Sequence, residues 1–253
     1  MYNKQWYQGT YTFDFIVQRY KENTQTLNKV FKDKYGLNHL PDKLSDEELD
    51  IFSGLLGVEA NEGLFLLNYL KQCLSLDGDV CEYGVAQGAT STLIAKTING
   101  AKDLFLFDSF EGLPKPSEED GLKDDIFNLG DMSRYEGTMK CHPQECMARL
   151  QMHNLHLNGN IKVVPGFVEN TLQHSPDKVC FAFIDFDFYE PIKITLQYLH
   201  ERLVKGGIFF IDDYDFFSTG VEKAVKEFLE DTDCYKMFVP EKWVGNFCIL
   251  EKQ

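Results

Sequence analysis

Residues 181–191, FAFIDFDFYEP, and residues 206–215, GGIFFIDDYD, decide the fold class of this chain of 253 residues. Each is an apolar, aromatic-rich run with the character of a buried β-strand, and each ends abruptly in acidic residues. In an open α/β sheet, the ligand site lies outside the carboxyl ends of the parallel strands. The two runs therefore predict neighbouring strands that deliver their terminal acids to one place.

Three aspartates, Asp185, Asp212 and Asp213, would meet at that place. Like charges that converge repel one another unless a cation lies among them. A site with oxygen ligands alone favours Mg²⁺ or Ca²⁺ over Zn²⁺. At the end of a single strand, an acid could simply face water. Because two successive strands end in the same way, the pattern favours a metal site.

The segments around these two runs predict an α/β fold. Strands are expected at DVCEYG (79–84), DLFLFDS (103–109) and IKVVPG (161–166), and they alternate with helices such as the one expected at 191–204. The last two strands, YKMFV (235–239) and NFCILE (246–251), are close enough to pair as an antiparallel hairpin. We expect a mostly parallel sheet with helices on both faces.

The first part of the chain has a different pattern. Residues 1–75 are expected to be helical, with a capping box at Ser45 and Glu48 that begins one of the helices. This predicts an N-terminal helical cap at 1–75 and a sheet domain at 76–253.

The amino-acid composition argues against some classes of binding partner. The net charge of −15 and the pI of about 4.8 argue against a basic surface for nucleic acid or for an anionic membrane. No apolar run approaches the ~20 residues needed to span a bilayer, and residues 1–11 lack the apolar core of a signal peptide.

Seven scattered cysteines predict reduced thiols in a cytoplasmic protein. KCHPQEC (140–146) has no second cluster to form a zinc site with.

The turn after the first expected strand points to a cofactor. Gly84 and Gly88 allow a tight turn and a close approach of a ligand to the backbone. The helix that follows from Thr90 can receive a polar group at its first amides. Because only two glycines are present, the turn is not the dinucleotide fingerprint. We expect Gly84, Gly88 and Thr90 to lie at the cofactor.

Two acids indicate which cofactor it is. Glu82 directly precedes the turn, where a carboxylate would repel a pyrophosphate but would suit an α-ammonium group. Asp108 ends the second expected strand, where an acid can accept two hydrogen bonds from a ribose diol. A ligand with both a ribose and an amino-acid end is S-adenosylmethionine.

Four segments in this order resemble the macrocin O-methyltransferase family: DVCEYGVAQG (79–88), LFLFDSFEGLP (104–114), FIDFDFYEP (183–191) and GGIFFIDDY (206–214). The similarity covers about residues 75–225, and DSFEGLP (108–114) is its most specific element. Members of the family are class I, metal-dependent enzymes that methylate sugar hydroxyls in antibiotic pathways. The resemblance implies a Rossmann-like class I methyltransferase sheet.

The resemblance also implies residue roles. The residues that hold S-adenosylmethionine would be Glu82, Gly84, Gly88 and Asp108, with Ser109 and the turn at Gly166-Phe167 near the adenine. Asp185, Asp212 and Asp213 would bind Mg²⁺. Asp185 would also accept the proton of the acceptor hydroxyl, and Asp187 is the alternative because it has the same side-chain parity along a strand. The chain departs from the family pattern at Ala86-Gln87, Phe186 and Pro191, which leaves the acceptor open.

A stretch of about 30 residues separates the second expected strand from the next helix. So long a connection in a compact domain is usually functional or disordered. It follows Asp108 directly, so we expect residues 110–140 to form a lid over the site, with a disordered acidic insertion as the alternative.

The expected acceptor is a small molecule carrying a sugar hydroxyl. A catechol or another non-sugar molecule is one alternative, and a non-catalytic S-adenosylmethionine-binding protein is another. A nicotinamide oxidoreductase ranks third because the three-glycine turn is absent. A homo-oligomer is compatible with the sequence.

Overall fold

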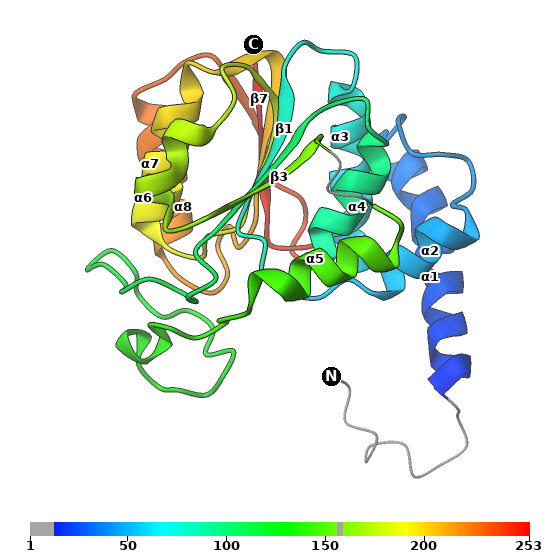
Figure 1. Cartoon of the computed structure of the whole chain (residues 1–253), viewed down its shortest axis with the longest axis horizontal. Coiled ribbons are helices and arrows are strands. Elements are labelled where there is room, and N and C mark those ends of the chain that lie inside the picture. Colours follow the sequence, from blue (N-terminus) through cyan, green and yellow to red (C-terminus); the bar gives the residue numbers. More distant parts are fainter. Residues whose placement is uncertain (1–12, 156–158) are drawn as a thin grey trace.

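A computed structural model describes residues 13–155 and 159–253, which form a seven-stranded sheet with helices on both faces (Figure 1). The strand order is β3-β2-β1-β4-β5-β7-β6, and β7 alone runs against its neighbours. The predicted mostly parallel sheet with a C-terminal antiparallel hairpin is confirmed. Residues 1–11, on which the signal-peptide argument depends, lie outside the described residues.

The strands are short, and most are buried on both faces. Their bounds are β1 (Asp79–Tyr83), β2 (Leu104–Asp108), β3 (Ile161–Pro165), β4 (Val179–Ile184), β5 (Leu203–Ile211), β6 (Tyr235–Phe238) and β7 (Cys248–Lys252). The helices are α1 (Phe13–Tyr35), α2 (Asp46–Ser53), α3 (Ala60–Cys73), α4 (Ala89–Ile98), α5 (Pro143–Met152), α6 (Val168–Thr171), α7 (Tyr189–His200) and α8 (Gly220–Glu230). Two 3₁₀ turns, η2 (Met132–Tyr135) and η3 (Leu172–His174), complete the elements.

One predicted boundary is wrong. The helix expected at 191–204 is α7, which ends at His200 because Leu203 already pairs with Val179 in the sheet. The apolar residues after the helix therefore belong to β5. The capping box at Ser45 and Glu48 is confirmed: each side chain bonds to the other residue's backbone N–H at the start of α2.

Side chains alternate between two cores, one on each face of the sheet. Val80 and Phe181 pack with α1 to α5, whereas Cys81 and Ala182 pack with α6 to α8 (Figure 1). The helices expected as an N-terminal cap share the first of these cores with the sheet. This arrangement brings α3 against β4 and β5 on the face to which Glu82 points.

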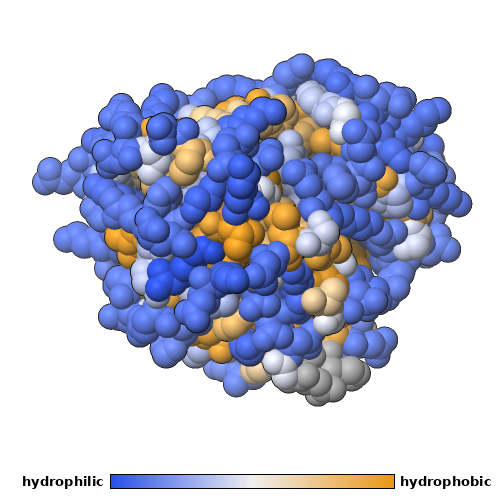
Figure 2. Space-filling model, turned by 90° about the horizontal axis from the view of Figure 1, so that it is seen from above, coloured by the Kyte–Doolittle hydropathy of each residue, from blue (hydrophilic) through white to orange (hydrophobic). Residues whose placement is uncertain are grey.

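Hydrophilic residues cover most of the face seen in Figure 2, in keeping with the acidic composition. Within residues 13–155 and 159–253, none of the helices combines the length and the apolar character that crossing a membrane requires.

Candidate active site

The strand register places the ends of β1, β2, β4 and β5 in one row. Tyr83 lies beside both Phe107 and Ile184, and Ile184 lies beside Ile211. The residues at the end of β2 and directly after β1, β4 and β5 therefore lie together at one edge of the sheet: Asp108, Gly84, Asp185 and Asp212. The sequence argument that these strand ends converge is sound.

Glu82 is a fully buried carboxyl group one residue before the first turn. The Thr90 hydroxyl donates a hydrogen bond to its Oε1 at 2.5 Å. Its Oε2 has no partner among the described residues. Burial raises the pKa of Glu82 to about 8, against an ordinary 4.5. An unpartnered buried carboxylate oxygen suits a cationic group such as an ammonium.

The two glycines of the turn are required by the packing of the protein on itself. A Cβ on Gly84 (φ +89°) would come within 1.8 Å of the Asp185 carbonyl oxygen. A Cβ on Gly88 (φ +75°) would lie 2.8 Å from the Cys146 Sγ on α5. Protein atoms thus occupy the positions of both missing side chains, whereas the sequence reading had placed a ligand against these backbones.

Asp108 fastens the turn after β1 to the loop after β2. One carboxylate oxygen accepts hydrogen bonds from the Val85 and Ala86 N–H groups at 2.7 and 2.8 Å. The other accepts the Phe110 N–H at 2.6 Å. Ala86 (φ +43°) and Phe110 (φ +56°) are both in the left-handed region, so the carboxylate holds two strained residues in place. Binding of a ribose diol by Asp108 stays a prediction.

The other residues expected near the adenine lie further along the same edge. Ser109 Oγ accepts the Glu111 N–H and donates to the Gly112 carbonyl, which shapes the start of the 110–140 segment. The Gly166 N–H donates to the Asp108 carbonyl at 2.8 Å.

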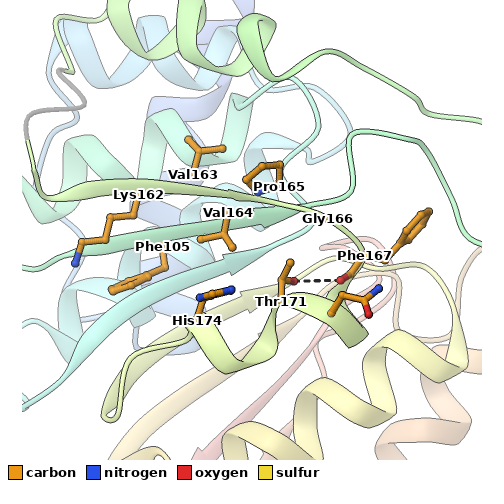
Figure 3. Close-up of a pocket in the computed structure, with 10 residues that line it drawn as sticks. Phe105, Lys162, Val163, Val164, Pro165, Gly166, Phe167, Thr171 and His174 are labelled. Atoms are coloured by element: carbon orange, nitrogen blue, oxygen red, sulfur yellow. Dashed lines mark hydrogen bonds between the residues drawn. The ribbon is translucent and has the colours of Figure 1, made fainter.

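Phe167 lies at the junction of two cavities. The first, of about 710 Å³, extends from Gly166 and Phe167 along β3 to Phe105 and His174 (Figure 3). The Thr171 hydroxyl donates to the Phe167 carbonyl at 3.2 Å and fixes the start of α6 there. The second cavity, of about 320 Å³, lies between Phe167 and the 110–140 segment. Neither cavity, as lined by described residues, includes the aspartates after β4 and β5.

Three aspartates form a cluster that could hold a metal ion. Carboxylate oxygens of Asp185, Asp187 and Asp213 lie within 4.8 Å of one another. Asp187 (φ +60°) and Asp213 (φ +54°) are both in the left-handed region, a strain that the surrounding structure must hold. The sequence had grouped Asp212, not Asp187, with the other two.

The Asp212 side chain lies between this cluster and the N-terminal helices, and its charge also acts on Asp185. Ile208 and Phe210 face the same core as α3, so by alternation Asp212 also faces α3. There it lies next to Glu62, a buried acid in the first turn of α3. Its Oδ1 accepts the Asp213 N–H at 2.8 Å. Burial, followed by the charge of Asp213, raises the pKa of Asp212 to about 7.

Glu62 was missed by the sequence reading. α3 carries buried side chains around most of its circumference, and Glu62 is the acid among them, 5 % exposed. Burial and then Asp212 raise its pKa well above the ordinary range. An acid shortly before the apolar run LFLL (64–67) was the available signal, but its neighbour in space is 150 residues away in sequence.

The acid cluster lacks a cationic partner from the protein. In residues 13–155 and 159–253, no lysine, arginine or histidine forms an ion pair with Asp185, Asp187, Asp212 or Asp213. Burial and the neighbouring carboxylates raise the pKa of Asp185 and of Asp187 well above the ordinary range. Buried like charges of this kind are expected to recruit a cation. The all-oxygen donor set fits Mg²⁺ or Ca²⁺.

Residues 110–140 form an ordered segment with a small core of its own. Leu113, Met132 and Tyr135 pack against Phe188 and Phe217, which follow β4 and β5. The Tyr135 hydroxyl donates to Asp125 at 2.6 Å. In Figure 1 the segment, in green, lies beyond the ends of the strands. It is therefore built against the loops that carry the acid cluster.

The fold is similar to that of solved O-methyltransferases. The structure of the O-methyltransferase NovP matches with a TM-score of 0.67 and 18% identity, over 92% of this chain and 99% of that one. The calicheamicin methyltransferase CalS11 matches with a TM-score of 0.60 and 21% identity, over 96% and 94%. The class I methyltransferase fold that the sequence predicted is confirmed.

Two characterised proteins are similar in sequence. Demethyldecarbamoylnovobiocin O-methyltransferase of Streptomyces niveus is 26% identical over 60% of this chain and 61% of its own length. Mycinamicin III 3''-O-methyltransferase of Micromonospora griseorubida is 28% identical over 60% of this chain and 63% of its own. Each match thus spans somewhat less than two thirds of the relative.

The model of one protein family matches most of the sheet domain. The match covers residues 69–248, from within α3 to the start of β7, and so includes every strand end described above. This chain belongs to the macrocin O-methyltransferase (TylF) family.

Proposed function

We propose that the protein is a Mg²⁺-dependent O-methyltransferase that moves a methyl group from S-adenosylmethionine to a hydroxyl of a sugar or sugar-containing small molecule. The proposal depends on one observation. The same edge of the sheet carries a Glu82 carboxylate oxygen without a hydrogen-bond partner and a cluster of three aspartates. Membership of the family supports the reaction type. The names of the two relatives, both O-methyltransferases of antibiotics, support the class of acceptor.

The turn after β1 would bind the amino-acid end of the cofactor. S-adenosylmethionine supplies a methyl group already made electrophilic by its sulfonium. Glu82 would receive the α-ammonium group, and Thr90 keeps that carboxylate oriented through its hydrogen bond. Asp108 fixes the turn through the Val85 and Ala86 amides. Phe167, which lines both cavities, would lie at the adenine end, and Ser109 is proposed to lie near it.

The acid cluster would prepare the acceptor. Asp185, Asp187 and Asp213 would hold Mg²⁺, with Asp212 behind them against Glu62. When bound, the ion supplies a positive charge that lowers the pKa of an acceptor hydroxyl. Asp185 is our choice for the base that accepts the hydroxyl proton, and Asp187 is the alternative. Holding acceptor and cofactor in line is worth up to roughly 7–11 kcal/mol of the barrier in model reactions.

The test combines metal dependence with a panel of acceptors. Labelled S-adenosylmethionine is incubated with free deoxysugars, nucleotide-linked deoxysugars and catechol, each with Mg²⁺ or with excess chelator. We expect transfer to a sugar hydroxyl that a chelator abolishes and Mg²⁺ restores. Full transfer in excess chelator would contradict the cation, transfer to catechol alone would identify the alternative acceptor class, and binding without any transfer would indicate a cofactor-binding protein.

Two substitutions, one inside the aspartate cluster and one outside it, test which residues bind the metal. Asp213→Asn removes a charge from the cluster, whereas Asp103→Asn removes one from an exposed ion pair with Lys162 at the other end of β2. We expect Asp213→Asn alone to raise the Mg²⁺ concentration needed for half-maximal activity. Asp185→Asn and Asp187→Asn are compared in the same way. Loss of the base should lower kcat even at saturating Mg²⁺. Loss of a metal ligand should be offset by a higher Mg²⁺ concentration.

A further inference from the structure

Arg149 is a cation on α5 that the proposed reaction does not use. α5 follows the 110–140 segment and packs on α4 (Figure 1). Within the part of the chain that the structure describes, no aspartate or glutamate forms an ion pair with Arg149. Its guanidinium donates instead to two backbone carbonyl groups from distant parts of the chain. A guanidinium carries donors on separate nitrogens of one rigid plane, so it can join two carbonyl groups that lie apart.

The first carbonyl group belongs to the turn expected to bind the cofactor. Arg149 Nε donates to the Gln87 carbonyl oxygen at 3.0 Å. Gln87 directly precedes Gly88, the N-cap residue of α4. Cys146, one turn earlier on the same side of α5, lies where a side chain on Gly88 would be. Because Asp108 holds N–H groups earlier in the same turn, the turn is fixed at both of its ends.

The second carbonyl group belongs to the N-terminal helices. Arg149 Nη1 donates to the Gly54 carbonyl oxygen at 3.0 Å. Gly54 is the C-cap of α2, where carbonyl groups lack partners within the helix and the helix dipole favours a cation. α2 is itself anchored in the core through Ile51 and Phe52. Arg149 therefore ties the cofactor turn to a helix that lies outside the family match at 69–248.

We propose that Arg149 is a positioning residue of the cofactor turn, with the end of α2 as its anchor. Its bond to the Gln87 carbonyl oxygen orients the peptide group that joins Gln87 to Gly88. That peptide group leads into α4, where Thr90 orients the Glu82 carboxylate. Arg149 thus acts through the backbone on the part of the site that would take the amino-acid end of S-adenosylmethionine. The inference rests on the proposed function, because it assumes that the cofactor binds at this turn.

The test compares variants of Arg149 in the whole chain. Arg149→Met keeps a long side chain that favours a helix but removes every donor. Arg149→Lys keeps the charge but has one nitrogen in place of the two that bond here. Arg202→Met is the matched control, because Arg202 also donates to a backbone carbonyl group, that of Tyr198 at 3.0 Å, but precedes β5 at the opposite edge of the sheet.

Two ligands separate a role in the turn from a general role in stability. Calorimetry measures the affinity of each variant for S-adenosylhomocysteine and for adenosine, which lacks the amino-acid end. Thermal unfolding checks that each variant is folded at the temperature of the measurement. If Arg149→Met does not fold, the same comparison of the two ligands is made with Arg149→Lys.

We expect Arg149→Met to bind S-adenosylhomocysteine about tenfold more weakly, as loss of a hydrogen bond from a charged group typically costs, and to bind adenosine as the wild type does. Arg149→Lys should lie between the two, and Arg202→Met should match the wild type for both ligands. Unchanged S-adenosylhomocysteine affinity in folded Arg149→Met, or an equal loss for both ligands, overturns the inference and leaves the cofactor site standing. Wild-type affinity in Arg149→Lys also overturns it, since the charge alone would then suffice. A wild-type protein without saturable S-adenosylhomocysteine binding overturns the cofactor site and this inference together.

Discussion

Gly84 and Asp185 lie backbone against backbone at the ends of β1 and β4. A Cβ on Gly84 would come within 1.8 Å of the Asp185 carbonyl oxygen, and the Asp185 N–H donates to the Tyr83 carbonyl at 2.7 Å. The turn expected to bind the cofactor and the cluster expected to bind the cation are therefore one packed unit. A substitution in the turn should therefore also change ligand binding at the cluster, and a substitution in the cluster should change binding at the turn.

Gly84→Ala tests this coupling. The new methyl group would meet the Asp185 carbonyl, and the left-handed backbone (φ +89°) disfavours alanine. We expect the free energy of unfolding to fall by at least about 2 kcal/mol, with weaker binding of both S-adenosylhomocysteine and Mn²⁺. Chemical denaturation and calorimetry measure these effects.

Gly57→Ala is the control for backbone strain alone. Gly57 has a similar φ of +83°, but a Cβ there has no neighbour within 4 Å. Gly57→Ala should lower the free energy of unfolding by about 1–2 kcal/mol and leave ligand binding unchanged. Equal losses in the two variants would show that strain, and not the contact with Asp185, makes Gly84 necessary.

Asp108→Asn should loosen the cofactor turn. An amide can replace one carboxylate oxygen, but its NH₂ group would then oppose either the Val85 and Ala86 N–H groups or the Phe110 N–H group. We expect S-adenosylhomocysteine affinity to fall about tenfold or more, since hydrogen bonds to charged groups are worth about 1.5–3 kcal/mol. Calorimetry measures this, with Asp103→Asn as the control. Wild-type affinity in Asp108→Asn would exclude both the turn-holding role and ribose binding.

Glu82 predicts a pH dependence whose sign follows from its raised pKa. The folded value of about 8 exceeds the ordinary 4.5, so the folded state prefers the proton and ligand-free protein loses stability as pH rises between these values. Glu82→Gln removes that loss. The variant should be more stable than the wild type near pH 8 and similar to it near pH 5, as denaturant unfolding at several pH values measures.

Ligand binding should show the opposite trend at Glu82. An ammonium group needs the charged carboxylate, so S-adenosylhomocysteine affinity should increase as pH rises toward about 8. Glu82→Gln should bind more weakly and lose most of this dependence. A variant that is less stable at high pH, or that binds as well as the wild type, would show that Glu82 has a structural role only.

Much of the fold could be predicted because its signals are local. The apolar runs of β4 and β5 end in acids, the glycines of the first turn lie at fixed spacing, and the capping box before α2 spans only Ser45 to Glu48. The end of α7 could not be predicted, because pairing of Leu203 with Val179 overrides a helical pattern that continues in the sequence.

The membership of the acid cluster depended on information that is not local. Side-chain parity holds along a strand, but Asp187 and Asp213 leave their strands with positive φ, so parity no longer tells where they point. Asp212 keeps the parity of β5 and therefore reaches Glu62 on α3. That contact joins distant parts of the chain, and no spacing rule predicts it.

The 110–140 segment is attached to the site at Asp120, which is 5 % exposed. Asp120 Oδ1 accepts the Tyr189 N–H at the start of α7 at 2.8 Å, and Oδ2 accepts the Ser117 N–H. Next to it, Gly121 and Thr219 exchange two hydrogen bonds, and the Lys123 N–H donates to the Phe217 carbonyl. Part of the expected lid is therefore fixed to the loop after β5.

We predict that closure over the acceptor depends on this attachment. Asp120→Ala should leave the Tyr189 N–H unpaired and speed hydrogen exchange across 110–140, while Asp124→Ala, at an exposed acid of the same segment, should not. Because an open segment admits water to the reacting groups, kcat should fall in Asp120→Ala. In the wild type, cofactor plus acceptor should protect the amides beyond Lys123, whereas those of Gly121 and Lys123 are protected already. Equal exchange with and without ligands beyond Lys123, or full turnover in Asp120→Ala, would show that the segment is a fixed wall and not a lid.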